Sequence, residues 1–500
     1  MSPTPIISIA QMRAMDAAAP LLGVPTRGLM ENAGEALAQS VMARFSPRPT
    51  AVLCGPGANG GDGWVCARLL HRAGWPVWVE TLVSRDALRG DPADAAAAFA
   101  GPIMALGDPA CPTAALAVDA LFGAGLNKPL EGAARAAALA WAYRPEAVVA
   151  ADTPSGVPGD GGPPLGDVAF RAGLTVSFEA LKPAHVLEPW RSFCGETIIA
   201  SIGMPPQAFA SAGAPLATAN GPALWGAALP RPGVEAHKHS RGHVMVVSGG
   251  LVQTGAARLA AISALRAGAG LVTVLSPPDA VRVHAAHLTA VMLREIPDLV
   301  ALEAAIKEAD AVVIGPALGL AADFQDHVLA VCRGGAPAVL DADVFSLFRD
   351  QAQILFQALR PSDVLTPHRG EFQRVFPELL EVAPNRIAAA KAAATLARAT
   401  VLLKGPDTVI AAPDGRCAVN GAGTPYLATA GSGDVLAGVI AGLLAQGMDS
   451  FLAASAGAWL HGQCGEALGP GLIAEDLPSA LPGALRSALE PRSTLGETEA

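Results

Sequence analysis

The chain has 500 residues, which is too long for one ordinary hydrophobic core, so we expect two or more domains. Hydrophobic residues make up 51% and charged residues 16%, a composition that excludes a largely disordered chain. The formal net charge is -10 and no basic cluster stands out, so we expect no nucleic-acid partner. Apolar runs such as Val435–Leu444 are too short to span a bilayer, and the seven scattered cysteines suit reduced thiols. We therefore expect a cytoplasmic protein with no membrane partner.

In the first half of the chain, short β-rich runs alternate with longer helical segments. A helix is expected over Leu29–Arg44 and another over Gly63–Ala73. The predicted strands are Thr50–Cys54, Val77–Leu82, Ala117–Ala120, Ala147–Ala151 and Leu174–Ser177. This alternation favours a parallel sheet with helices on both faces.

The alternation is interrupted once and then resumes. A segment rich in Pro, Ala and Gly predicts a linker over 206–227, between one domain at 1–205 and another at 228–490. Helices are expected over Gly255–Ala267 and Asp434–Gln446. The predicted strands of the second half are Gly242–Ser248, Leu271–Leu275, Ala311–Ile314, Ala338–Leu340 and Thr400–Leu403. The sequence therefore predicts two α/β domains.

A glycine-rich loop, residues 55–63, follows the first predicted strand and holds five glycines in nine residues. Its spacing satisfies G-x-G-x-x-G, and Glu80 lies twenty residues beyond the last of those glycines, as in a dinucleotide-binding dehydrogenase. Asp62 argues against that interpretation, because a carboxylate near a helix start competes with a pyrophosphate for the same positive potential. A tight turn without a ligand is the remaining alternative.

Two further segments, 118–126 and 151–156, also follow predicted strands. Such segments lie at the carboxyl edge of a parallel sheet, where these folds bind ligands. Each alone could be a loop whose Asp or Ser caps a helix. Three in one domain favour a site.

The motifs GPGANGGDG, VDALFGAGL, DTPSG and LMENAG resemble those of the NAD(P)H-hydrate epimerases over residues 1–205. The resemblance implies a Rossmann-like domain whose potassium ion is held by Asn59, Asp119 and Ser155. Ala58 stands where that family commonly has a second Asn. The implied contacts to the hydrated cofactor are Ala58, Asn59, Gly60, Gly61, Asp62, Gly123, Ala124, Gly125, Leu126, Asn127, Lys128, Pro129 and Asp152.

Exchange of the R and S configurations at the hydrated ring carbon needs proton-transfer groups near that carbon. Asp152, beside the rigid Pro154–Gly156 turn, is our candidate for this role. Lys182 is a second candidate, with a surface lysine as the equally weighted alternative.

A second constellation begins at Gly431-Ser432-Gly433-Asp434, directly before an apolar helical segment. Small residues at a helix start can surround a transferring phosphoryl group. Asp434 is either an ordinary helix cap or a general base that deprotonates a substrate hydroxyl. The motif G-x-x-x-x-G-K-[ST] is absent, which argues against a P-loop enzyme.

Four more segments accompany it: Ile314–Gly319, Leu340–Asp343, Thr366–Glu371 and Leu403–Thr408. Together these motifs resemble the ribokinase-like fold and, more narrowly, the NAD(P)H-hydrate dehydratases, over about 228–490. The resemblance implies hydrate contacts at Ala256, Gly319, His368 and Asp434. It implies adenylate contacts at Lys404, Gly405, Pro406, Asp407, Thr408 and Gly433.

This chain departs from the dehydratase motifs at three positions. Arg369 replaces the usual Pro, Ser432 the usual Thr and Ala317 a usual Gly. If the backbone at residue 317 needs a positive φ, alanine adopts it at a higher cost than glycine.

The resemblance implies that Asp434 activates the hydrate hydroxyl toward the terminal phosphate of ADP, with Mg2+ as companion of the phosphates and AMP and phosphate as products. We expect the small-molecule substrates NADHX, NADPHX and ADP, and a homo-oligomer. Three alternatives stay open: a ribokinase-like vitamin-precursor kinase, an N-terminal domain reduced to a binding module, and a simple dehydrogenase. The dehydrogenase would leave the second constellation unexplained.

Overall fold

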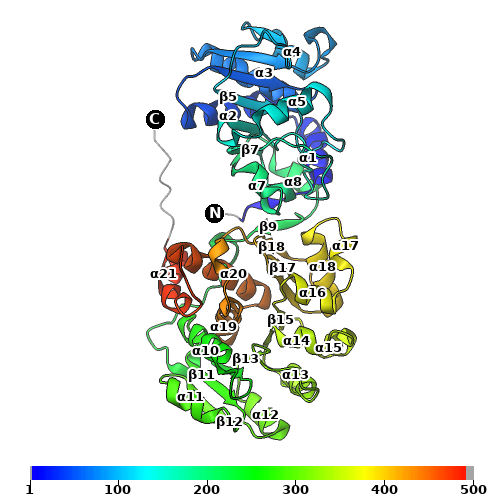
Figure 1. The fold of residues 1–500 in the computed structure, drawn as a ribbon. Helices are drawn as coiled ribbons and strands as arrows, with labels where there is room; N and C mark the ends of the chain where they lie inside the picture. Colours follow the sequence, from blue (N-terminus) through cyan, green and yellow to red (C-terminus); the bar gives the residue numbers. More distant parts are fainter. Residues whose placement is uncertain (1–2, 491–500) are drawn as a thin grey trace. The chain divides into compact units, whose positions relative to one another are not determined.

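The computed structural model describes residues 3–490 (Figure 1). The chain folds into two compact units, one over residues 4–217 and one from Thr218 onward. Both are α/β units with largely parallel sheets, as the sequence predicts. Among the described helices, none has the length and apolar character needed to cross a membrane.

The N-terminal unit contains a seven-stranded sheet in the order β4-β3-β2-β5-β6-β7-β8, and all of its neighbouring strands are parallel. The strands are β2 (Thr50–Cys54), β3 (Val77–Thr81), β4 (Ile103–Ala105), β5 (Leu116–Ala120), β6 (Val148–Ala151), β7 (Leu174–Phe178) and β8 (Glu196–Ala200). Its helices are α1 (Ile9–Leu21), α2 (Thr26–Arg44), α3 (Ala58–Arg72), α4 (Asp91–Ala97), α5 (Gly132–Trp141), α6 (Pro183–Val186), α7 (Arg191–Cys194) and α8 (Pro206–Ser211).

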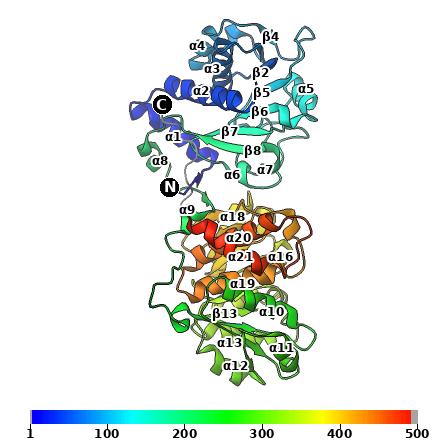
Figure 2. The same ribbon diagram turned by 90° about the vertical axis from the view of Figure 1, so that its left-hand side faces the viewer.

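Helices cover both faces of this sheet, which explains why the central strands β2, β5 and β6 are buried along their whole length. Successive side chains of a strand point to opposite faces, so Val52 packs in the same core cluster as α2, α3 and α4. Leu53 packs in the cluster that contains α5. Figure 2 shows α2, α3 and α4 on one side of the strands and α5 on the other.

The glycine-rich segment after β2 differs from its prediction, because α3 begins at Ala58 and not near Gly63. Asn59 and Asp62 therefore lie on a helix and not in a loop. Gly60 allows a close approach of this helix to the strand end: a Cβ there would lie 1.9 Å from the carbonyl oxygen of Gly55. The glycines thus serve helix–strand packing at the sheet edge.

The C-terminal unit contains one large sheet in the order β9-β18-β17-β16-β15-β14-β13-β10-β11-β12. The pairs β16–β17 and β17–β18 are antiparallel and the other pairs are parallel. The strands are β9 (Ala217–Ala219), β10 (His243–Val247), β11 (Leu271–Ser276), β12 (Met292–Glu295), β13 (Ala311–Ile314), β14 (Ala338–Leu340), β15 (Val364–Leu365), β16 (Thr400–Leu403), β17 (Val409–Ala411) and β18 (Cys417–Val419).

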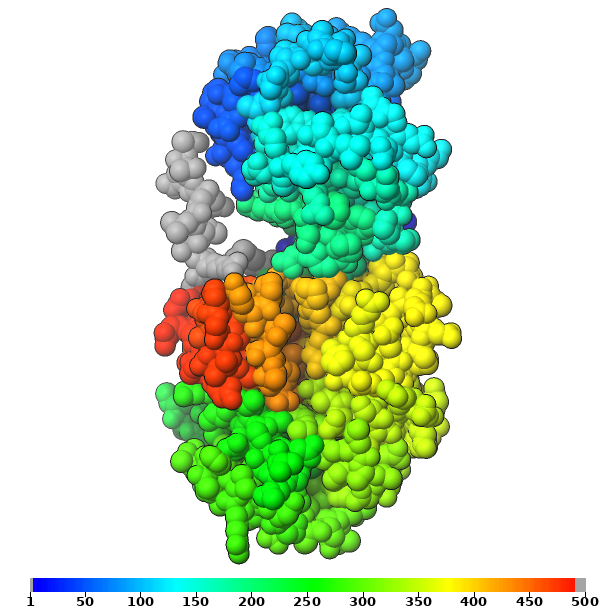
Figure 3. All heavy atoms as spheres, viewed as in Figure 1, coloured from blue at the N-terminus to red at the C-terminus, as the bar shows by residue number. Residues whose placement is uncertain are grey.

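The helices of this unit pack on both sides of the sheet. They are α9 (Pro222–Trp225), α10 (Thr254–Arg266), α11 (Val281–His287), α12 (Leu299–Ile306), α13 (Phe324–Arg333), α14 (Asp343–Leu347), α15 (Ala352–Ala358), α16 (Arg369–Val375), α17 (Leu379–Val382), α18 (Arg386–Ala397), α19 (Ser432–Ala445), α20 (Ser450–Leu468) and α21 (Leu477–Leu489). The main core cluster joins α10, α19, α20 and α21 to strand residues such as Val246 and Val313. Figure 3 shows the green and the orange-to-red segments of this unit next to one another, in agreement with the packing of α10 on α19 and α21.

The segment 206–227, for which the sequence predicts a linker, contains α8, β9 and α9. β9 pairs with β18, and Trp225 is fully buried in a T-shaped contact with Trp459. The boundary between the two units falls within this segment, between Ala217 and Thr218. The helices and the strand on either side of this boundary pack against the rest of the units.

Candidate active sites

In the N-terminal unit, the segments after β2, β5 and β6 meet at the carboxyl edge of the sheet and border a cavity of about 540 Å³. Seven predicted contact residues line this cavity: Ala58, Asn59, Asp62, Gly123, Ala124, Gly125 and Asp152. Six others are not among its lining residues: Gly60, Gly61, Leu126, Asn127, Lys128 and Pro129. Each predicted segment therefore contributes some of its residues to the cavity lining, and the other six predicted contacts lie outside that lining.

Asp152 directly follows β6 in a left-handed conformation with φ of +60°. Its Oδ1 lies 2.6 Å from the Nζ of Lys182, and its Oδ2 accepts the N–H of Ala124 at 3.2 Å. Burial alone would raise the pKa of Asp152, but the Lys182 ammonium and these hydrogen bonds hold that pKa below its ordinary value. Asp152 is therefore ionised at neutral pH.

Lys182 is fully buried, so the alternative of a surface lysine is wrong. Its Nζ also donates to the Oγ of Ser177 and to the carbonyl of Phe178, each at 3.1 Å. His185 orients the backbone here: its Nδ1 accepts the N–H of Lys182 at 3.1 Å, so its Nε2–H donates to the carbonyl of Asp152 at 2.9 Å. Burial lowers the pKa of His185 to about 4, which keeps its ring neutral.

Asp119 and Ser155 lie behind the cavity wall and bind each other. The Oγ and N–H of Ser155 each donate to the Asp119 carboxylate at 2.7 Å, and Ser155 Oγ accepts the N–H of Phe122 at 2.9 Å. Burial raises the pKa of Asp119 to about 6. The amide nitrogen of Asn59 is buried and has no hydrogen-bond partner among the described residues.

Other cavity residues were missed by the sequence analysis. Asp16 and Arg13 reach the cavity from α1, Thr26 from the start of α2, and Asp91 from the start of α4. Burial and the charge of Asp152 raise the pKa of Asp16. No glycine-rich motif marks these helices, so the sequence offered no signal for them.

Glu80, the ribose ligand of the dehydrogenase interpretation, lies on β3 and accepts a hydrogen bond from Trp78 Nε1 at 3.0 Å. It is not among the residues that line the cavity. The geometry therefore gives the dehydrogenase interpretation no support.

In the C-terminal unit, Asp434 lies in the first turn of α19. Its partial burial and the nearby carboxylates of Asp341 and Asp343 raise its pKa to about 7, although the Lys404 ammonium opposes this shift. A carboxylate with this pKa exchanges a proton readily at neutral pH.

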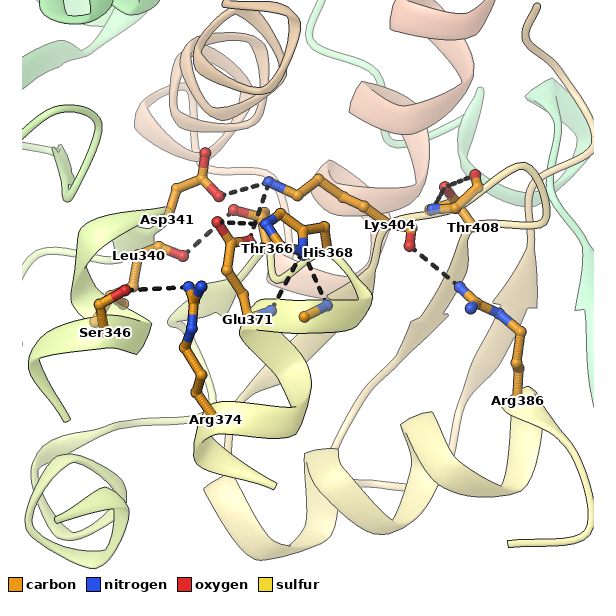
Figure 4. A network of polar contacts seen from close by, with 12 residues as sticks. Leu340, Asp341, Ser346, Thr366, His368, Glu371, Arg374, Arg386, Lys404 and Thr408 are labelled. Atoms are coloured by element: carbon orange, nitrogen blue, oxygen red, sulfur yellow. Dashed lines mark hydrogen bonds and ion pairs between the residues drawn. The ribbon is translucent and has the colours of Figure 1, made fainter. Parts of the chain in front are cut away.

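Lys404 directly follows β16, and its side chain points toward Asp341 and Glu371 (Figure 4). Its Nζ lies 2.8 Å from Asp341 Oδ1 and 3.7 Å from Glu371 Oε2. A Cβ added to Gly433 would lie 3.3 Å from the same Nζ. The structure therefore brings three predicted residues, Lys404, Gly433 and Asp434, into one charged cluster.

His368 caps the start of α16, where its Nδ1 accepts the N–H groups of Gly370 and Glu371. Its Nε2 lies 3.2 Å from Glu371 Oε1, and its side chain is 54% exposed. The backbone just before His368 is hydrogen-bonded to Lys404, because the Lys404 N–H donates to the Pro367 carbonyl at 2.8 Å. His368 thus combines a structural role with a position beside the charged cluster.

The other predicted positions lie on separate elements. Gly405 and Thr408 form a turn in which the Gly405 N–H donates to Thr408 Oγ1 at 3.1 Å. The Gly319 N–H donates to Asp343 Oδ2 at 2.9 Å. Ala256 lies in the first turn of α10, and no polar contact connects it to the cluster.

Two departures from the dehydratase motifs have clear structural settings. Ala317 has φ of +49°, so the concern about a positive φ at this position is confirmed. Ser432 Oγ lies 3.0 Å from the Nε2 of His461 on α20, so this serine contacts a neighbouring helix.

Comparison with known proteins identifies the family of both units. A family model described as NAD(P)H-hydrate dehydratase matches residues 244–481, and the model of the YjeF-related protein N-terminus matches residues 26–184. A bifunctional NAD(P)H-hydrate repair enzyme of Moorella thermoacetica is 35% identical, and the alignment covers 94% of each chain. The chain belongs to the family of bifunctional NAD(P)H-hydrate repair enzymes.

Among solved structures, part of this family member is similar to a ribokinase-like superfamily protein of Enterococcus faecalis, with 27% identity, a TM-score of 0.48, and coverage of 53% of this chain and 93% of that chain. It is also similar to an ADP/ATP-dependent NAD(P)H-hydrate dehydratase of Bacillus subtilis that was co-crystallised with ATP and Mg2+. The identity is 28%, the TM-score 0.44, and the coverage 52% of this chain and 94% of that chain.

Proposed function

We infer that this chain repairs hydrated NADH and NADPH in two steps. The N-terminal unit interconverts the R and S hydrates, and the C-terminal unit dehydrates the S hydrate at the expense of ADP, giving NAD(P)H, AMP and phosphate. The observation that carries this inference is that a chain of this family holds two separate charged sites. One is the cavity with the Asp152–Lys182 pair, and the other is the cluster of Asp434 and Lys404.

In the dehydration step, Asp434 accepts the proton of the hydrate hydroxyl, and that oxygen attacks the terminal phosphorus of ADP, whose bond to the bridging oxygen breaks and releases AMP. Its pKa of about 7 suits a base at neutral pH. The phosphorylated carbon then loses phosphate together with a proton from the adjacent ring carbon, which restores the ring double bond. The oxygen of the hydrate leaves in the phosphate, so the step is a net dehydration.

The nucleotide binds along the turn Gly405–Thr408 and the helix start at Gly433, with Lys404 directed at its phosphates. The position of Lys404, a largely buried cation next to Gly433, supports this role. Mg2+ fits the carboxylates of Asp341 and Asp343, which follow β14 at the same edge of the sheet. When bound, this ion would neutralise phosphate charge that Lys404 alone does not balance.

In the epimerisation step, the ionised Asp152 serves as the proton acceptor beside the hydrated ring carbon. Lys182 holds Asp152 in its charged form and in one orientation. The oxygens of Asn59, Asp119 and Ser155 suit a hard monovalent cation such as K+. A potassium ion there would balance the buried charge of Asp119 and attract an oxygen of the substrate.

Separation of the R hydrate, S hydrate and NADH by chromatography tests both assignments in the full chain. With ADP present, Asp152→Asn is expected to consume the S hydrate at the wild-type rate and the R hydrate only at the spontaneous rate. Asp434→Asn is expected to keep the two epimers in exchange and to form no NADH. Each variant is the folding control for the other, and phosphorus NMR identifies AMP and phosphate as products. Variants that each retain both steps would contradict the proposed function.

A further inference from the structure

The cavity of the N-terminal unit holds a second carboxyl group, Asp62, in surroundings opposite to those of Asp152. Asp62 lies three residues after Asn59 on α3, so both side chains occupy the helix face that borders the cavity. Asp62 is only 7% exposed, and within residues 3–490 its side chain makes no hydrogen bond or ion pair. A buried carboxyl group directed at a cavity without a protein partner is a site for a ligand atom.

The charges around the two carboxyl groups differ in sign. Asp152 holds the Lys182 ammonium, whereas Asp62 is surrounded by the carboxylates of Asp152 and Asp16 and by the thiols of Cys54 and Cys66. Arg13 and Asp91 also line the cavity, and Arg13 donates to the carbonyl of Gly125. Burial, reinforced by these carboxylates, raises the pKa of Asp62 well above its ordinary value. The cavity therefore holds one carboxyl group whose burial favours the neutral form and one that the Lys182 ammonium holds in the charged form, the arrangement of an acid–base pair.

On the basis of the proposed function, we propose that Asp62 is the general acid of the epimerisation and Asp152 is its general base. Asp62 donates its proton to the hydroxyl oxygen of the hydrated ring carbon. The carbon–oxygen bond breaks, its electron pair leaves with the water, and the lone pair of the ring nitrogen forms a carbon–nitrogen double bond. Water then adds to the other face of the planar carbon, the double-bond electrons return to the nitrogen, and Asp152 accepts the proton of the added water. Each turnover moves one proton from Asp62 to Asp152, and proton exchange with solvent water restores both groups before the next turnover.

The substitution Asp62→Asn tests this assignment, because asparagine keeps the shape and neutral charge of the carboxylic acid and has no acidic proton. With purified R hydrate and no nucleotide, kcat is expected to fall by about 100-fold or more, the usual contribution of a general acid, and KM is expected to stay unchanged. The S-hydrate dehydratase rate of the same chain should remain at the wild-type value. The matched control is Asp86→Asn, an exposed carboxyl group of the same unit that does not line the cavity, and it should leave kcat unchanged. In water labelled with 18O, the wild-type protein should place the label in the hydroxyl group at the rate of epimerisation.

Three results would overturn the proposal: an Asp62→Asn variant with the wild-type kcat, a variant with only a raised KM, or epimerisation by the wild-type protein without 18O incorporation. If Asp62→Asn loses its thermal transition, Asp62→Ser provides the same comparison with a smaller neutral side chain. A wild-type protein that does not interconvert the epimers at all would instead overturn the proposed function of the N-terminal unit. If the wild-type protein interconverts the epimers and Asp62→Asn has the same kcat, only the role of Asp62 is overturned.

Discussion

The buried ion pair between Lys182 and Asp152 predicts a specific, pH-dependent loss of stability in Lys182→Met. The Nζ of Lys182 contacts Asp152 at 2.6 Å and donates to two further acceptors, and the side chain is 0% exposed. Methionine fills similar space but leaves the Asp152 carboxylate without its cation. Removal of one partner of a buried pair costs about 3–5 kcal/mol. We expect about 3 kcal/mol, the lower limit of that range, because Asp152 remains 17% exposed and can take up a proton.

The pH dependence distinguishes this cause from a simple packing defect. In the wild-type protein the pKa of Asp152 is depressed, so this carboxylate stabilises the fold above its ordinary pKa and loses that contribution as pH falls through the depressed value. In Lys182→Met, burial raises the pKa of Asp152, so protonation relieves the penalty. The difference in unfolding free energy should therefore be largest near pH 7 to 8, should begin to shrink above the ordinary carboxyl pKa of about 4, and should shrink further as pH falls toward the depressed pKa of the wild-type protein.

Urea unfolding followed by tryptophan fluorescence measures this difference, because most tryptophans report on the N-terminal unit. Five of the seven tryptophans lie there: Trp64, Trp75, Trp78, Trp141 and Trp190. The double variant Lys182→Met with Asp152→Asn should recover part of the lost stability. A loss below about 1 kcal/mol, or a loss that is independent of pH, would refute the reasoning.

Three further substitutions concern the C-terminal unit. Asp434→Asn is expected to lower the dehydratase kcat by about 100-fold or more. The wild-type kcat/KM should rise with pH through an apparent pKa of about 7, since the base must be deprotonated, and a flat pH profile would contradict the role of Asp434. Gly249→Ala places a Cβ 1.9 Å from the carbonyl oxygen of Ala317 and should abolish most dehydratase activity, whereas Gly255→Ala meets no atom within 4 Å and should leave it intact. Equal activity of these two alanine variants in the same assay would show that the close approach at Gly249 is unimportant.

The strands of the two sheets could be predicted where they form buried apolar runs. The runs at Thr50–Cys54 and Ala311–Ile314 match β2 and β13 because both faces of these strands are covered by helices. Short strands such as β15 (Val364–Leu365) were missed, because two residues carry no periodic pattern. The start of α3 was misplaced because glycine normally indicates a loop. Here its absent side chain permits close packing.

In the two sites, residues marked by a local sequence motif could be predicted, and residues placed by tertiary packing could not. The sequence motifs identified Asn59, Asp152 and Asp434, because these residues follow strand ends or begin helices where ligands bind. The burial of Lys182 and the placement of Asp16 depend on elements far along the chain, α6 and α1, whose positions no local pattern specifies. The glycine usual at position 317 pointed to a possible positive φ there, and Ala317 does have a positive φ.

The most direct test of two successive active sites in one chain is the recovery of reduced-nicotinamide absorbance from purified R hydrate and ADP. The wild-type chain should restore the absorbance fully. Asp152→Asn should do so only at the rate of spontaneous epimerisation, and Asp434→Asn not at all. A mixture of the two variants should regain rapid recovery, because the S hydrate formed by one diffuses to the other. No recovery with the wild-type chain and either ADP or ATP, or no recovery above the Asp152→Asn rate in the mixture, would contradict the account.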